Sequence, residues 1–243
     1  MFSARLGSSG RLKQGEMKIE LAEYPFVSGS LVNSGQADMI SDRFPAYESA
    51  LSWMRDFVAR PDSRINRPGA VCPRLAPAFR QDLIWCVSIE LQRWTVDETV
   101  AKGIHLADLY FRLFPDPQQF KTGSLLGLLP GLPPGRAAEI VDEGHRRLRM
   151  DFVSRGLMLG EFHPRSQVVS VRNPEFLVMR SPVPMFAVRA LTVHDLMFLD
   201  TPQTDPIDRL QYFKHYLDHL GGQLSPSARD RVHLRIQKAE GEL

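Results

Sequence analysis

The chain has 243 residues, of which 43% are hydrophobic and 24% are charged. These proportions are typical of globular proteins and exclude a disordered or membrane-embedded chain. Its 30 Lys and Arg residues nearly balance its 28 Asp and Glu residues, so the net charge of +2 does not indicate nucleic-acid binding. The two cysteines, Cys72 and Cys86, are too few for a disulfide framework and favour a cytoplasmic protein.

Two regions differ in composition. Residues 1–43 are rich in Ser and Gly and lack sustained hydrophobic periodicity, which predicts a flexible N-terminal arm in which Leu21–Val27 can dock locally. Residues 44–243 are predicted to form a single domain. This domain begins with a helix, because apolar residues recur at helical spacing from Tyr47 to Val58 and Pro61 ends the pattern.

Strands and helices then alternate along the chain. Short apolar runs predict four strands, at 83–91, 124–129, 157–162 and 184–190. Helical periodicity predicts helices between the first three strands, at 95–114 and 135–152, the first starting with a capping box of Thr95 and Glu98. A short helical turn that Thr192 caps and two terminal helices, at 208–220 and 228–238, complete the chain.

This order defines the expected fold class. An initial helix, a β-α-β-α-β-β series and terminal helices predict an α+β fold with one mixed sheet of about four strands, covered by helices. The helices that connect the first three strands should lie on one face of that sheet.

The third predicted strand carries the candidate catalytic residues. With the two-residue period of a strand, Glu161 and His163 share one face, and Phe162 lies on the other. His163 ends the strand just before Pro164, where a rigid element supports a loop. A histidine there can be a general base, a metal ligand or an axial haem ligand, and Glu161 can orient it. Alternatively, His163 bonds to Glu161 or to the loop backbone and only fixes the turn.

The loop that follows this strand is rich in Pro and Arg. The chain contains 18 prolines, and those in this loop restrict its conformations. Arginine offers a planar pair of donors that fits a carboxylate or a phosphate. The candidate substrate-binding residues are Arg165, Arg172, Asn173, Arg180 and Arg189. Arg189 lies within an apolar strand and needs an anionic partner, for which Glu161 is the candidate.

Four segments in a fixed order carry a resemblance to known proteins. They are GLMLGEFHP (156–164), RNPEF (172–176), RSPVPMFAVR (180–189) and DLMFL (195–199). Together they resemble a bacterial family of domains of unknown function, over residues 71–199. The Cys72–Pro73 dipeptide and the late Phe, His, Pro and Arg residues are also similar to the YqcI/YcgG proteins, which include haem-dependent amino-acid N-hydroxylases. This second resemblance implies haem held by His163, or by the Cys72 thiolate, with loop arginines on the propionates.

Three functions follow as hypotheses. The first is a haem-dependent oxygenase that acts on an amino acid or amine, in specialised-metabolite biosynthesis. The second is a non-catalytic module that binds a small acidic ligand or a partner protein on the Arg- and Pro-rich loop. The third is a purely structural network of Glu161, His163 and Arg189. We expect a small-molecule substrate, neither nucleic acid nor a membrane as partner, and a chain that is compatible with a homodimer.

Overall fold

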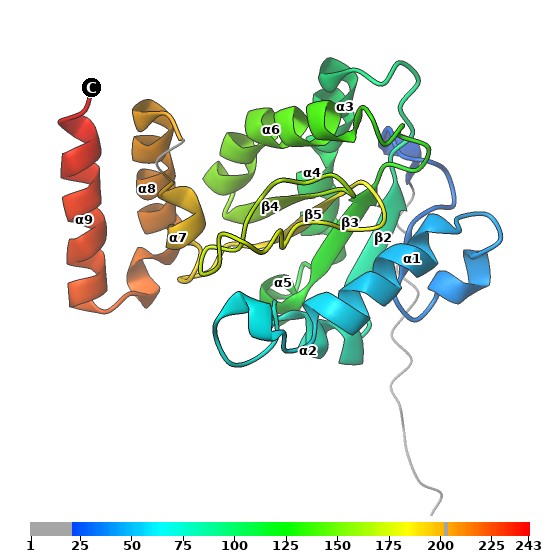
Figure 1. Cartoon of the computed structure of the whole chain (residues 1–243), viewed down its shortest axis with the longest axis horizontal. Helices are drawn as coiled ribbons and strands as arrows, with labels where there is room; N and C mark the ends of the chain where they lie inside the picture. The colour runs from blue at the N-terminus through cyan, green and yellow to red at the C-terminus, as the bar shows by residue number, and fades with distance from the viewer. Residues whose placement is uncertain (1–20, 202–203) are drawn as a thin grey trace, which may run out of the picture.

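The computed structural model describes residues 21–201 and 204–243, which form an α+β fold around one mixed sheet (Figure 1). The five strands lie in the order β1-β2-β3-β5-β4, and only β2 and β3 are parallel. Their bounds are β1 (Val32–Asn33), β2 (Ile84–Ser88), β3 (Ser124–Leu128), β4 (Leu157–Phe162) and β5 (Met185–Ala190). The predicted fold class is confirmed. The additional strand β1 has two residues, which is too short to give an alternating pattern.

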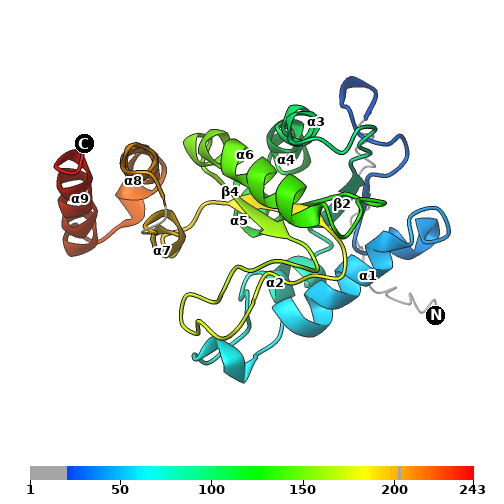
Figure 2. The same cartoon turned by 45° about the horizontal axis from the view of Figure 1, so that its top comes forward.

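Helices cover both faces of the sheet (Figures 1 and 2). One face carries α3 (Val96–Gly103), α4 (His105–Leu113) and α6 (Glu143–Ser154). The other face carries α1 (Ala46–Trp53) and α2 (Leu75–Arg80), and α5 (Pro117–Thr122) packs against α2. The two helical segments predicted between β2, β3 and β4 correspond to α3 with α4 and to α6, and they share one face, as predicted; α5, which also lies between β2 and β3, was not predicted and packs against α2. Two π-helical segments adjoin these helices, η3 (Met54–Val58) after α1 and η5 (Ala138–Asp142) before α6.

The C-terminal helices form a further layer beside α6. They are α7 (Leu196–Leu199), α8 (Pro206–Leu220) and α9 (Pro226–Glu240). Helix α8 packs against α6, and α9 packs against α8, so α9 is the outermost helix (Figure 1). Residues such as Leu199, Phe213 and Val232 form a hydrophobic core of this layer, separate from the core around the sheet. No helix within the described ranges has the length and apolar composition of a membrane span.

Residues 21–43 belong to the folded domain, so the packed segment extends well beyond the Leu21–Val27 stretch that was expected to dock. Leu21 and Phe26 are buried in the main core, and β1 pairs with β2. The Tyr47 hydroxyl donates a hydrogen bond of 2.7 Å to the carbonyl oxygen of Ser30. Apart from the two-residue β1, this segment has only short 3₁₀ turns, η1 (Leu21–Glu23) and η2 (Ala37–Ile40), so it lacks the hydrophobic periodicity that would predict its packing. Residues 1–20 of the predicted arm lie outside the described residues.

The pairing of β4 with β5 decides which side chains can meet. Glu161 lies opposite Phe186, and Met158 lies opposite Arg189. Directly opposed residues share a face, and successive residues alternate between faces. Phe186 packs beneath Gly144 of α6, so Glu161 also faces α6, whereas Arg189 faces the opposite side. The sheet therefore separates Glu161 from Arg189.

Candidate functional site

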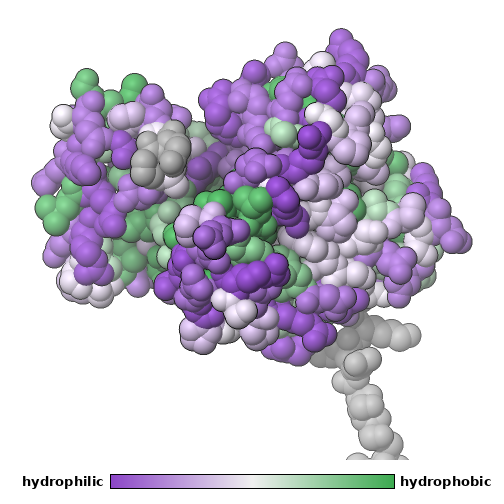
Figure 3. Space-filling model, viewed as in Figure 1, coloured by the Kyte–Doolittle hydropathy of each residue, from purple (hydrophilic) through white to green (hydrophobic). Residues whose placement is uncertain are grey.

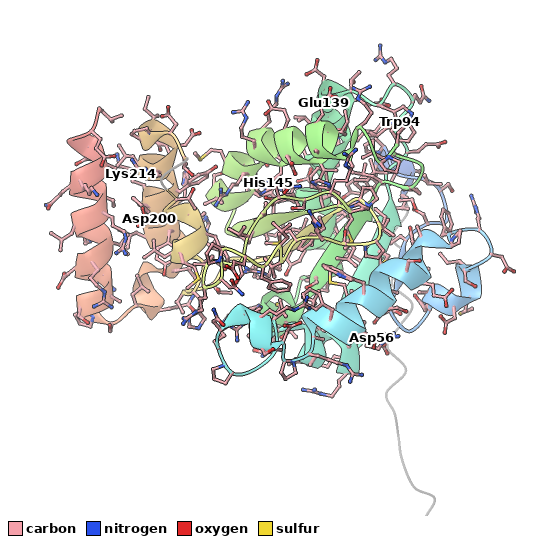
Figure 4. The ribbon with its side chains drawn as sticks, viewed as in Figure 1. Asp56, Trp94, Glu139, His145, Asp200 and Lys214 are labelled. Carbon is pink, nitrogen blue, oxygen red and sulfur yellow. The ribbon has the colours of Figure 1, made fainter. Side chains whose placement is uncertain are left out.

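Two histidine–carboxylate pairs connect the end of β4 to the start of α6. The Nε2 atom of His163 lies 2.9 Å from Asp142 Oδ1, and the Nδ1 atom of His145 lies 3.3 Å from Glu161 Oε2. In the first pair the histidine follows β4 and the carboxylate comes from η5. In the second pair the histidine comes from α6 and the carboxylate from β4. Figure 4 shows His145 between α6 and the strands. The prediction that Glu161 and His163 share a face is confirmed, because both reach the α6 side.

Both ring nitrogens of His163 are already engaged. The Nδ1 atom accepts a hydrogen bond of 3.3 Å from the backbone N–H of Arg165, so Nδ1 carries no proton. The proton is then on Nε2, which donates to Asp142. The ring is completely buried. His163 therefore has no free nitrogen for a metal or a substrate proton, and Asp142 is the partner that the sequence did not identify.

The backbone of His163 holds the long loop between β4 and β5. Its carbonyl oxygen accepts hydrogen bonds from Ser166 N–H at 3.2 Å and from Ser181 N–H at 3.4 Å. Ser166 is near the start of the loop and Ser181 near its end. One residue thus fixes both ends of a segment that has no helix or strand of its own.

His145 is a buried histidine with two partners. Its Nε2 atom lies 3.1 Å from the carbonyl oxygen of Leu159, which can only accept, so Nε2 is the protonated nitrogen. Burial lowers the pKa of His145 below its usual value, and the charge of Glu161 opposes this shift. Glu161 therefore lies beside His145, and both side chains face α6.

The predicted partnership of Arg189 with Glu161 is wrong. Arg189 instead forms a bidentate ion pair with Asp195, with two N–O distances of 2.7 Å. Asp195 is almost completely buried and also accepts from the N–H and hydroxyl of Thr192. Thr192 is thus held by Asp195, and α7 starts after Asp195 rather than at a Thr192 cap. Once the register of β4 against β5 is known, the alternation of side chains along a strand places Glu161 and Arg189 on opposite faces of the sheet.

The predicted loop residues have different roles. Asn173 donates a hydrogen bond of 2.8 Å to the carbonyl oxygen of Arg64, and Asn66 donates one of 3.1 Å to that of Arg172. These two amide contacts dock the loop onto the segment around η4 (Ser63–Ile65), and Figure 2 shows the two segments side by side. The side chains of Arg165 and Arg172 are exposed. Asn173 is therefore a docking residue in this structure.

The docked loop borders an open cavity of about 420 Å³ against α1 and η3. The cavity is lined by Trp53, Phe57, Arg64, Glu175, Phe176, Leu177 and Arg180. Three of these side chains are aromatic, and Figure 3 shows apolar surface over the loop on this side of the molecule. Of the predicted binding residues, only Arg180 lines the cavity. Trp53 and Phe57 were missed because an aromatic residue on a predicted helix is most often a core residue, and Phe176 was noted only as part of the RNPEF segment.

The aromatic side chains of the cavity wall form a connected group. The ring centroids of Trp53 and Phe57 are 5.6 Å apart, and those of Phe57 and Phe176 are 5.9 Å apart in an edge-to-face arrangement. Trp53 also lies 5.6 Å from Phe162 of β4. Such contacts between rings rigidify an apolar wall. The cavity therefore has a preformed surface for a flat or apolar group.

The charged groups of the cavity differ in how far they are neutralised. Arg64 forms a bidentate pair with Asp62, at 2.9 and 2.6 Å, and lies over the Phe176 ring at 4.2 Å. Arg180 donates from Nε to the carbonyl oxygen of Ser166 at 3.1 Å. Among residues 21–201 and 204–243, neither Arg180 nor Glu175 forms an ion pair. Arg180 therefore keeps its charge and its terminal nitrogens for a ligand.

The residues present do not fit the haem expectation. His163 is buried with both nitrogens bonded, and the cavity lining contains neither histidine nor cysteine. Cys72 is half-buried ahead of α2, and its N–H donates to the carbonyl oxygen of Val58. Cys86 is fully buried in β2, and burial raises the pKa of its thiol. Within the described part of the chain, no group of three or more His, Cys, Asp or Glu side chains could hold a metal ion.

Most of the chain matches a family that is defined by its sequence. Residues 47–231 match the family described as Domain of unknown function (DUF6875). The match spans more than half of the chain, so the protein belongs to this family. No curated protein and no solved structure matches the chain. The resemblance to a family of domains of unknown function is thus confirmed, with a longer span than its motifs indicated.

Proposed function

We propose that this protein binds a small organic anion with an apolar or aromatic body, in the cavity between α1 and the loop 163–184. One observation carries this proposal. Three aromatic side chains and the guanidinium of Arg180, which has no acidic partner among the described residues, line the same cavity of about 420 Å³. Small-ligand sites commonly combine an apolar wall with a few polar groups that fix the orientation of the ligand.

The chemistry of these residues suits a carboxylate. Trp53, Phe57 and Phe176 offer a surface for a ring or hydrocarbon, which is driven there by removal of apolar area from water. The terminal nitrogens of Arg180 offer two parallel donors for the two oxygens of a carboxylate. Arg64 is already neutralised by Asp62, so its main contribution is its flat face and its contact with Phe176.

The loop is built for a fixed conformation, which supports binding. Prolines restrict its backbone, His163 holds its two ends, and Asn173 docks its middle. A site that is ordered before binding loses less conformational entropy when the ligand arrives. The position of the cavity supports the non-catalytic alternative. The acid–base candidates Glu161 and His163 face α6, whereas the cavity adjoins α1 on the other side of the sheet.

The location and partners of the protein complete the proposal. Cys72 and Cys86 are free thiols, which fits a reducing compartment such as the cytoplasm. The ligand is a small molecule, and neither nucleic acid nor a membrane is expected as a partner. A homodimer stays compatible with this function but is not required by it.

A thermal-shift and titration experiment tests the proposal. We expect aromatic carboxylates such as benzoates and phenylacetates to raise the melting temperature of the full chain, and the matched neutral amides to have a smaller effect. Arg180→Gln should weaken the apparent affinity at least about tenfold, because a charge-assisted bidentate contact is lost. Arg172→Gln is the matched control, since Arg172 is on the same loop but outside the cavity. Equal responses in Arg180→Gln and the unaltered protein would refute the proposal.

A further inference from the structure

Glu175 is the acidic residue in the lining of the cavity beside the loop 163–184. Within the described ranges its carboxylate forms no ion pair, although two guanidinium groups, those of Arg64 and Arg180, line the same cavity. Arg64 is instead held by both carboxylate oxygens of Asp62. A carboxylate without a cation repels an anionic ligand, so a simple organic anion is only a partial complement to this cavity.

The lining carries two separate charges of opposite sign. Because the pair of Arg64 and Asp62 is neutral, the guanidinium of Arg180 and the carboxylate of Glu175 are the charges that remain in the lining. These two groups do not form an ion pair with each other. A ligand with one negative charge would neutralise Arg180 and leave Glu175 uncompensated. A ligand that carries a charge of each sign would neutralise both.

Hydrogen bonds within the loop position the two charged residues independently. Arg180 donates from Nε to the carbonyl oxygen of Ser166 at 3.1 Å. The N–H of Glu175 donates to Asn173 Oδ1 at 3.0 Å, and the N–H of Phe176 donates to the carbonyl oxygen of Asn173 at 3.1 Å. The backbone at Glu175 is thus fixed by the residue that docks the loop. Groups that are placed before binding can fix the orientation of a ligand.

The aromatic wall offers a surface for the body of such a ligand. The guanidinium of Arg64 lies 4.2 Å from the centroid of the Phe176 ring and 5.9 Å from that of Phe57. Among residues 21–201 and 204–243, no cationic side chain lies over the ring of Trp53. Tryptophan attracts both aromatic rings and ammonium groups. Trp53 is therefore the ring of the wall that remains available to a ligand.

We infer that the ligand is a zwitterion, with a carboxylate that binds Arg180, an ammonium group that binds Glu175 and an aromatic or apolar body against Trp53. An aromatic amino acid is the simplest molecule with this chemistry. The inference rests on the proposed function, because it adds an ammonium group to the carboxylate that Arg180 binds. It concerns binding alone and assigns no reaction to the site.

L-Phenylalanine and 3-phenylpropanoate are the probes for the test, because they differ only in the ammonium group. Each is titrated into the full chain at neutral pH and constant ionic strength, and binding is followed by calorimetry and by the melting temperature. We expect L-phenylalanine to bind about fivefold more tightly than 3-phenylpropanoate. Glu175→Gln should weaken the binding of L-phenylalanine and strengthen that of 3-phenylpropanoate, since an amide neither attracts the ammonium group nor repels the carboxylate.

The opposite signs of these two changes separate a binding role of Glu175 from a structural one, which would change both affinities in the same direction. Glu48→Gln is the matched control and should change neither affinity, because Glu48 is exposed on α1 and outside the cavity lining. Equal affinities for the two probes, or changes of the same sign in Glu175→Gln, would overturn the inference. The proposed function would still stand if 3-phenylpropanoate binding depended on Arg180. Absence of binding by both probes would refute the inference and the proposed function together.

Discussion

The imidazole of His163 is completely buried, and its Nε2 atom lies 2.9 Å from Asp142 Oδ1. This contact joins the end of β4 to the π-helical segment η5 that leads into α6. The same residue accepts hydrogen bonds from Arg165, Ser166 and Ser181 along the loop. His163 is therefore the point at which the sheet, a helix and the loop 163–184 meet.

Substitution of His163 should destabilise the protein. In His163→Leu the acceptor for Arg165 N–H and the donor to Asp142 are lost, which should cost about 1–3 kcal/mol in the free energy of unfolding. His163→Gln should retain part of this stability, because its amide can still donate to Asp142. Urea unfolding followed by circular dichroism measures both values. A His163→Leu protein as stable as the unaltered one would contradict the anchoring role.

Haem spectra should not depend on His163. Because its two nitrogens are hydrogen-bonded and its ring is buried, we expect protein from haem-supplemented cells to give the same absorption spectrum with His163 and with His163→Ala. Cys72→Ser serves as the second comparison. A Soret band that shifts or disappears in His163→Ala would show that the ring can leave its hydrogen bonds and bind iron.

Replacement of Gly156 should be costly. Gly156 follows α6 with a φ of 74°, a conformation that costs an L-residue about 1–2 kcal/mol. A Cβ atom there would also lie 2.9 Å from Nδ1 of His219. We expect Gly156→Ala to reduce the free energy of unfolding by at least about 1 kcal/mol. Gly135→Ala, where nothing lies within 4 Å of the new Cβ, should change it by less. Similar losses at both positions would contradict this explanation.

The stability of the protein should depend on Glu98 at acidic pH. Burial opposes ionisation of Glu98, but hydrogen bonds from the N–H groups of Gln92 and Arg93 and the charge of Lys102 outweigh it and lower its pKa to about 2. Because the pKa is lower in the folded state than in the unfolded chain, ionised Glu98 stabilises the fold. This contribution is fully present above the ordinary glutamate pKa of about 4.3 and is lost as the pH falls toward 2.

Glu98→Gln tests this dependence. The variant should be less stable than the unaltered protein at neutral pH, and the difference should shrink as the pH is lowered from about 4.3 to about 2. Chemical unfolding at a series of pH values gives the two curves. Glu48→Gln is the control, because Glu48 is exposed on α1 and its curve should parallel that of the unaltered protein. A constant gap between Glu98→Gln and the unaltered protein would refute the assignment.

Local patterns predicted much of the fold. The capping of α3 by Thr95 is confirmed, with a hydrogen bond of 3.2 Å from Glu98 N–H to the Thr95 hydroxyl. The Glu98 carboxylate, however, accepts from Gln92 and Arg93 rather than from Thr95, which the capping pattern could not indicate. Such contacts are decided by the path of the preceding loop. Helix 95–114 is also divided at Ile104 into α3 and α4.

The site was predicted less well because its contacts are distant in sequence. The two-residue period of β4 placed Glu161 and His163 on one face, since this period follows from the strand backbone itself. Their partners, His145 and Asp142, depend on how α6 packs over the sheet. The cavity depends on Asn66 and Asn173, whose hydrogen bonds span more than 100 residues. No spacing within the sequence reports such contacts.

The closure of the loop at His163 also bears on how the family can vary. Because one carbonyl oxygen joins Ser166 to Ser181, the residues between them form a closed segment that leaves the sheet undisturbed. The entropy of closing such a segment rises only slowly, by about 0.6 kcal/mol for each doubling of its length. Changes in the length of this segment therefore cost little entropy of loop closure, and they can be made without moving the strands of the sheet.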